Sequence, residues 1–193
     1  MARVGSRARI ALTAVAAALA AGCTAAAPTP ARPFSSSDFT PTSIRRFSEF
    51  PLYWVGTRFG GWPLVAIDGP MPPDDFITFI YGTCEPRPQD EEASCEPPLE
   101  IQVQPLCVHL EVVAADPVWE RRSVRSAPVG RIDHAPVLLS RTVQVKVYTD
   151  SLAVAWRVLA ALRSANEVAP VLGERDPIPA PPAAVLRGTH ACQ

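Results

Sequence analysis

Two stretches of the chain alternate between apolar and polar residues, and this pattern restricts the fold more than any other feature. They cover 99–104 and 143–148, and in each an apolar residue occupies every second position. Because successive side chains of a strand point to opposite faces, each stretch would bury one face and leave the other to solvent. Half-buried strands are typical of antiparallel sheets. The apolar positions are Leu99, Ile101, Val103, Val143, Val145 and Val147.

Two further strands are predicted upstream. Residues 64–67 are a short apolar run, which follows a Gly60-Gly61 turn and stops at Asp68-Gly69-Pro70. Residues 76–81 are rich in aromatic and β-branched side chains and are apolar on both faces, which predicts a central strand.

The segment that follows 143–148 is predicted to complete a β-hairpin. Thr149-Asp150-Ser151 is turn material, and 152–156 is apolar again. A short helix is expected over 157–168, with Val158, Leu159 and Leu162 on one face. Strands joined by turns dominate, so the predicted fold class is α+β, a mainly antiparallel sheet with a C-terminal helix.

The first 22 residues have the zones of a secretory signal peptide. Arg3, Arg7 and Arg9 precede an apolar run over 10–21, which is shorter than the roughly 20 residues that span a bilayer. The segment ends in Leu19-Ala20-Ala21-Gly22-Cys23 and resembles the lipobox of bacterial lipoproteins. The resemblance implies cleavage before Cys23 and a diacylglycerol on its thiol, which would anchor the protein to the outer side of the cell membrane.

Four further cysteines would then lie in an oxidising compartment, where two disulfides are expected and three connectivities are possible. Cys84 and Cys95 are the favoured first pair because the loop between them is short and polar. Cys107 and Cys192 would form the second pair by elimination. The predicted fold is therefore disulfide-stabilised.

The composition also predicts how the chain is divided. Residues 23–43 are the lipidated cysteine and a linker rich in Pro, Ser and Thr, 44–169 a globular domain, and 170–193 a Pro-rich tail. Removal of the signal takes three arginines and no acidic residue, which shifts the formal net charge from −1 to about −4. An acidic extracytoplasmic domain lacks the basic surface that nucleic-acid binding requires.

Candidate catalytic and metal-binding residues are sparse. Cys107 and His109 would share one face of an extended segment, as a Cys–His nucleophile pair requires, but the even number of cysteines favours a disulfide. His109, His134 and His190 lack the paired spacing of a zinc site. Neither a hydrolase elbow nor a Gly-rich phosphate loop occurs. No catalytic, cofactor-binding or metal-binding residue and no cofactor is assigned.

Three surface features remain as candidate binding elements. An acidic stretch runs from Glu85 to Glu100, and an arginine run over 121–131 is expected on another loop. We hypothesise that the two face each other or that one meets a charged partner. The context of Trp62 between Gly61 and Pro63 suggests exposure, although packing is favoured, and Trp156 is expected in the core.

Residues 79–86, with Ser94-Cys95 and 97–102, resemble a segment of actinobacterial lipoproteins to which no activity is assigned. That resemblance supports the compartment and the disulfide and implies no mechanism. The sequence thus predicts a non-enzymatic envelope binding module with an envelope protein or ligand as its partner. The alternative is an envelope-acting enzyme or enzyme accessory, with Asp74, Asp75 or His134 as acid/base groups.

Overall fold

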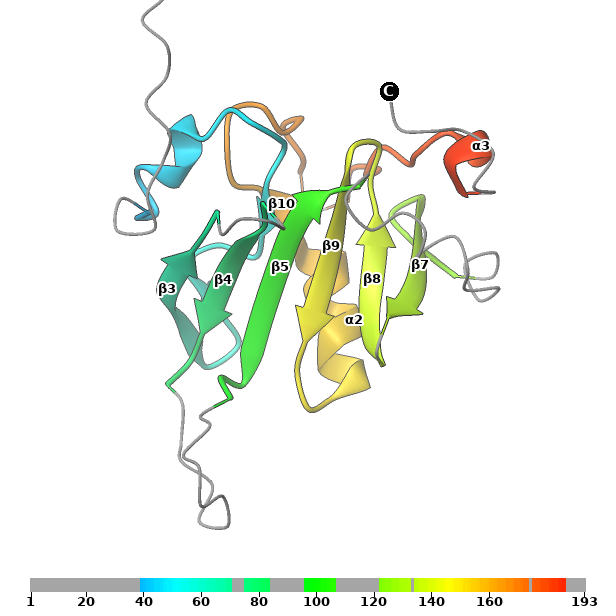
Figure 1. The fold of residues 1–193 in the computed structure, drawn as a ribbon. Coiled ribbons are helices and arrows are strands. Elements are labelled where there is room, and N and C mark those ends of the chain that lie inside the picture. Colours follow the sequence, from blue (N-terminus) through cyan, green and yellow to red (C-terminus); the bar gives the residue numbers. More distant parts are fainter. Residues whose placement is uncertain are drawn as a thin grey trace, which may run out of the picture. The chain divides into compact units, whose positions relative to one another are not determined.

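An antiparallel sheet of eight strands, in the order β2-β3-β4-β5-β9-β8-β7-β6, is the main feature of the protein (Figure 1). The computed structural model describes residues 39–70, 75–83, 96–106, 122–132, 134–173 and 175–186. The strands are β2 (Arg58–Phe59), β3 (Trp62–Asp68), β4 (Ile77–Tyr81), β5 (Leu99–Pro105), β9 (Val143–Tyr148), β8 (Ala135–Leu139), β7 (Ala127–Ile132) and β6 (Ser123–Val124).

Helix α2 (Leu152–Ala161) covers one face of the sheet and packs on β8 and β9; it lies behind the sheet in Figure 1. The apolar positions of β5 and β9 point to this covered face and are almost completely buried. The strands predicted over 99–104 and 143–148 are therefore confirmed, although Gln104 and Gln144 are buried on the polar face as well. We call the opposite side the open face; it carries the intervening polar residues Glu100, Gln102, Gln104, Gln144, Lys146 and Tyr148.

The predicted central strand over 76–81 is also confirmed. β4 pairs with β3 on one side and with β5 on the other, and Ile77, Phe79 and Tyr81 have no exposed surface. The short strand predicted over 64–67 lies within β3. The Gly60-Gly61 turn joins β2 to β3, and Gly60 has a φ of 56°, a conformation that glycine adopts without steric cost.

The hairpin predicted over 143–156 is wrong in its second half, because 152–156 is the start of α2 rather than a strand. The Ser151 side chain accepts a hydrogen bond from the backbone N–H of Val154 and caps the helix. Ala155, Val158 and Leu159 are buried at the i, i+3, i+4 spacing of one helix face. The predicted helix over 157–168 is correct only to Ala161.

Residues 122–139 contain a hairpin that the sequence analysis does not predict. β7 and β8 are joined by a tight turn, with Ile132 paired to Ala135. Arg131, which we expected on a loop, therefore lies in β7, while Arg125 is in the turn between β6 and β7. The alternation of β8 is hidden in the sequence because both of its faces are apolar and all five residues are buried.

The two ends of the described chain pack together beside the sheet. β1 (Tyr53–Trp54) pairs with β10 (Arg163–Ser164), and a short 3₁₀ helix, η2 (Ile44–Arg46), precedes them. Phe39 and Ile178 lie in the same apolar core.

The Pro-rich segment after 170 is held by Arg125. Its guanidinium donates hydrogen bonds to the carbonyls of Leu162, Gly173 and Asp176, and its own carbonyl accepts one from Ile178 N–H. One arginine thus joins the β6–β7 turn to the end of α2 and to the C-terminal segment.

A second apolar cluster lies on the open face. Val137 and Leu139 of β8 project there, since they pair with Lys146 and Gln144. Helix α3 (Ala183–Leu186) packs against this cluster through Val185 and Leu186. The buried members of the cluster are Leu106, Ile132, Val137 and Leu139.

The described residues thus form a mainly antiparallel sheet with a few short helices, as predicted. None of the helices in this part of the chain is long and apolar enough to cross a membrane. The remaining predictions concern residues outside the described ranges, so the disulfide part of the fold prediction stays a prediction. These residues are the signal segment 1–22, the linker to residue 38, Cys23, Cys84, Cys95, Cys107, Cys192, Asp74, His109, His190, Trp119, Arg121 and most of the acidic stretch.

Candidate functional site

Three adjoining hollows lie at the end of the sheet where β9 leads into α2. We call them together the end groove. The first and second share Tyr148, Thr149 and Asp150, and the second and third share Arg131, Pro136 and Leu152. The groove therefore passes from the open face, around the end of β9, to the side that carries α2. Its lining residues come from β5, β7, β8, β9 and α2 and from the turns and segments that join them.

The first, or acidic, hollow has a volume of about 360 Å³ and includes Glu96, Glu100 and Gln102. Burial raises the pKa of the Glu100 carboxyl, and the neighbouring charges of Glu96 and Asp68 raise it further. Glu100 lies opposite Tyr148 on the open face. This part of the groove is suited to a cationic or hydrogen-bond-donating group.

The middle hollow, of about 310 Å³, lies between the β7–β8 turn and the start of α2. His134 forms part of that turn and has a φ of 68°, in the left-handed region that tight hairpin turns use. Arg131 donates from Nη2 to the His134 carbonyl over 3.2 Å. This hydrogen bond ties the guanidinium to the turn at the rim of the groove.

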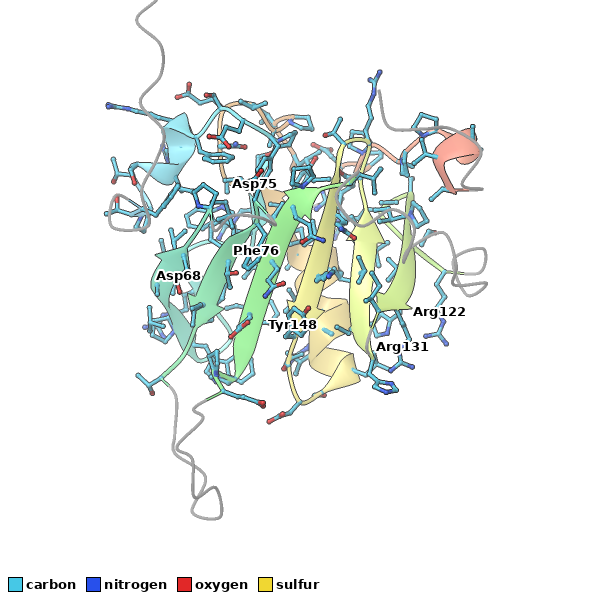
Figure 2. All side chains as sticks on the ribbon, viewed as in Figure 1. Asp68, Asp75, Phe76, Arg122, Arg131 and Tyr148 are labelled. Atoms are coloured by element: carbon cyan, nitrogen blue, oxygen red, sulfur yellow. The ribbon has the colours of Figure 1, made fainter. Side chains whose placement is uncertain are left out.

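The third, or arginine, hollow has a volume of about 300 Å³ and lies between α2 and the β7–β8 hairpin. The Arg122 guanidinium carbon is 5.5 Å from the centre of the Trp156 ring, within cation–π range. Figure 2 shows Arg122 and Arg131 next to one another at the lower edge of the sheet. The described residues that line this hollow are Arg122, Val129, Gly130, Arg131, Pro136, Leu152 and Trp156.

Asp75 and His134, the two acid/base candidates within the described residues, are not brought together. Asp75 precedes β4 at one end of the sheet, and His134 joins β7 to β8 at the other. Figure 2 shows Asp75 at the upper edge, far from Arg131, whose guanidinium bonds the His134 carbonyl. Among the described residues, no group of three or more His, Cys, Asp or Glu side chains is placed to hold a metal ion.

The described members of the acidic stretch and of the arginine run lie at the same end of the sheet, but they line different parts of the groove. Glu96 and Glu100 lie at one end of the groove, and Arg122 and Arg131 lie at the other. Neither arginine has a carboxylate partner within the described part of the chain. The groove residues that sequence reasoning missed are Tyr148, Pro136 and Leu152; they belong to strand and helix positions that carry no motif.

The tryptophan candidates behave differently from one another. Trp62 is half-buried at the start of β3 and packs against the main core, beside Gly82 and Pro98. Trp156 was expected in the core of a strand; it lies on α2 instead, where it is partly buried, packs against the main core and also lines the arginine hollow. The strand was wrong because the segment is helical, and residues 155 and 158 are the ones that the helix buries completely.

Comparisons of the chain with protein-family models, with curated proteins and with solved structures find no match.

Proposed function

We propose that this protein is an extracytoplasmic lipoprotein, tethered to the cell membrane by a diacylglycerol on Cys23, whose domain is a non-enzymatic binding module of the cell envelope. The lipobox at 19–23 and the signal features before it support the anchor. The end groove is the observation that carries the binding role. It combines carboxylates at one end with arginines and an aromatic ring at the other. The described acid/base candidates Asp75 and His134 lie at opposite ends of the sheet.

The anchor is tested by Cys23→Ala. This variant should be released from membranes or should retain the signal segment, because no other cysteine follows a lipobox. Metabolic labelling with a fatty-acid analogue should mark the wild-type protein only. Labelling of the variant at the wild-type level would contradict the anchor.

The binding role is tested with the intact lipoprotein purified from its own membranes. We expect that Arg131→Glu lowers the amount of co-purifying ligand or partner at least tenfold, because it reverses a charge inside the groove. Arg58→Glu is the matched control, since Arg58 is exposed in β2 at the opposite edge of the sheet. Equal recovery with both variants, both folded by circular dichroism, would refute a binding role for the groove.

Two disulfides belong to the same proposal. Tyr81 of β4 is paired with Leu99 of β5, and Cys84 follows the first by three residues while Cys95 precedes the second by four. The strand register thus supports a Cys84–Cys95 bond. The end of β4 lies beside the start of β5, and each cysteine is only a few residues from that point along the chain.

The second bond would join Cys107 to Cys192. Leu106, directly before Cys107, packs in the open-face cluster together with Leu186, six residues before Cys192. Peptide mapping without reduction, after cleavage at glutamates, should recover both linked pairs. Alkylation of any of the four thiols in the unreduced, denatured protein would contradict this pairing.

A further inference from the structure

The arginine hollow carries the most specific chemistry of the end groove. Its volume of about 300 Å³ lies at the lower end of the range for small-molecule sites. Two guanidinium groups face a space that has no carboxylate among its described lining residues. Within the described residues neither guanidinium is paired with a carboxylate; two positive charges beside one another repel, so an anion placed between them would be stabilised by both.

The Arg122 guanidinium lies over the Trp156 ring, a position that favours contact with an anion. A guanidinium that lies over an aromatic ring keeps all its N–H donors in its own plane, where they can reach a carboxylate or a phosphate in a two-point contact. Within the described chain Arg131 uses one donor, to the His134 carbonyl, and its remaining donors are available. Within the described residues each arginine is thus held by one contact and is paired with no carboxylate, while Asp150 lines the adjoining middle hollow.

The remaining walls of the hollow are apolar. Val129, Pro136 and Trp156 enclose it, and Leu152 at its mouth is 43% exposed. Leu152 and the uncovered part of Trp156 would lose contact with water if an apolar group entered the hollow, which favours binding. An inorganic anion would pair with the arginines but would leave the apolar walls exposed to water. A neutral apolar molecule would cover the walls but would make no ion pair with the arginines.

We infer that the arginine hollow binds a small amphiphilic organic acid, in which a carboxylate or a phosphate monoester is joined to a compact aromatic or branched apolar body. The anion lies between Arg122 and Arg131, and the apolar body lies against Trp156 and Leu152. This inference rests on the proposed binding role and gives its ligand class.

Isothermal titration of the full-length protein with four probes tests the inference. Phenylacetate and phenyl phosphate carry both features, phenylacetamide lacks the charge, and inorganic phosphate lacks the apolar body. At least one of the two acids should bind with a Kd of about 1 mM or tighter, as expected for a fragment of this size. Phenylacetamide and inorganic phosphate should bind at least tenfold more weakly. Equal binding of phenylacetate and phenylacetamide, or no binding of either acid, would overturn the inference.

Variants locate the site. Arg122→Gln and Arg131→Gln should each weaken binding of the acid at least tenfold, and Trp156→Leu should weaken it for the aromatic probes. Arg58→Gln, which removes the same charge at the far edge of the sheet, should leave it unchanged. Equal weakening by Arg58→Gln would show general attraction to positive charge and would refute the site. If the acids do not bind while Arg131→Glu still removes a co-purifying partner, the binding module stands and only this ligand class fails.

Discussion

Asn166, the only asparagine of the chain, offers the sharpest test of how the domain is held together. Its side chain is 6% exposed and makes four hydrogen bonds to the backbone. Its oxygen accepts from the N–H groups of Leu52 (2.9 Å) and Ala169 (3.2 Å). Its nitrogen donates to the carbonyls of Phe47 (2.9 Å) and Phe50 (2.8 Å). The amide therefore joins the segment before β1 to the segment after β10, with every one of its donors used.

Asn166→Ala removes all four bonds at once. Each leaves a backbone group without its partner at a buried position, at a net cost of about 1 kcal/mol per bond. Four such losses predict a decrease of about 4 kcal/mol in the free energy of unfolding. That is a large part of the roughly 5–15 kcal/mol expected for a whole domain. The melting temperature should fall by about 10 °C for a chain of this length.

Urea unfolding of the oxidised protein, followed by tryptophan fluorescence, measures this change. The slope of the free energy with urea should stay constant, since the surface exposed on unfolding is nearly the same. Gln102→Ala, which truncates a half-buried amide on the open face, is the control and should cost less than about 1 kcal/mol. A loss below about 1 kcal/mol for Asn166→Ala would refute the reasoning, because the four bonds would then contribute nothing beyond ordinary truncation.

Three other perturbations follow from the same structure. Both side-chain polar atoms of Gln144 are buried and have no hydrogen-bond partner among the described residues. Gln144→Met should therefore raise the unfolding free energy by about 1–2 kcal/mol in urea titrations, and a decrease would contradict this. Arg125→Met removes the three guanidinium hydrogen bonds that hold the C-terminal segment. Limited proteolysis within 170–178 should therefore become faster while the sheet stays folded. An unchanged cleavage rate would show that the arginine does not hold the segment. Burial and the neighbouring charges raise the pKa of Glu100 in the folded state, so the ionisation of this carboxyl lowers stability as the pH rises from its unfolded-state pKa through its folded-state pKa. Glu100→Gln should remove this contribution and flatten the pH dependence of the urea midpoint over that range, and an unchanged pH slope would contradict it.

Local patterns predicted the elements that depend on one face being buried. The strands over 99–104 and 143–148 follow from strict alternation, and the central strand over 76–81 follows from aromatic and β-branched side chains on both faces. The start of α2 was missed because 152–156 is a short apolar run, in which the periods of a strand and of a helix cannot be told apart. The cap at Ser151 decides in favour of the helix.

The sequence by itself determined a half-buried antiparallel sheet and the features on which the proposed membrane anchor rests, because both depend on residues that are close along the chain. Only the tertiary structure decided where the candidate site lies. The end groove joins Glu100, Arg131, Tyr148 and Trp156, which are brought together by the pairing of β5 with β9, by the β7–β8 hairpin and by the packing of α2 on the sheet. These contacts depend on strand order and on the path of the chain between distant elements, which no local pattern encodes.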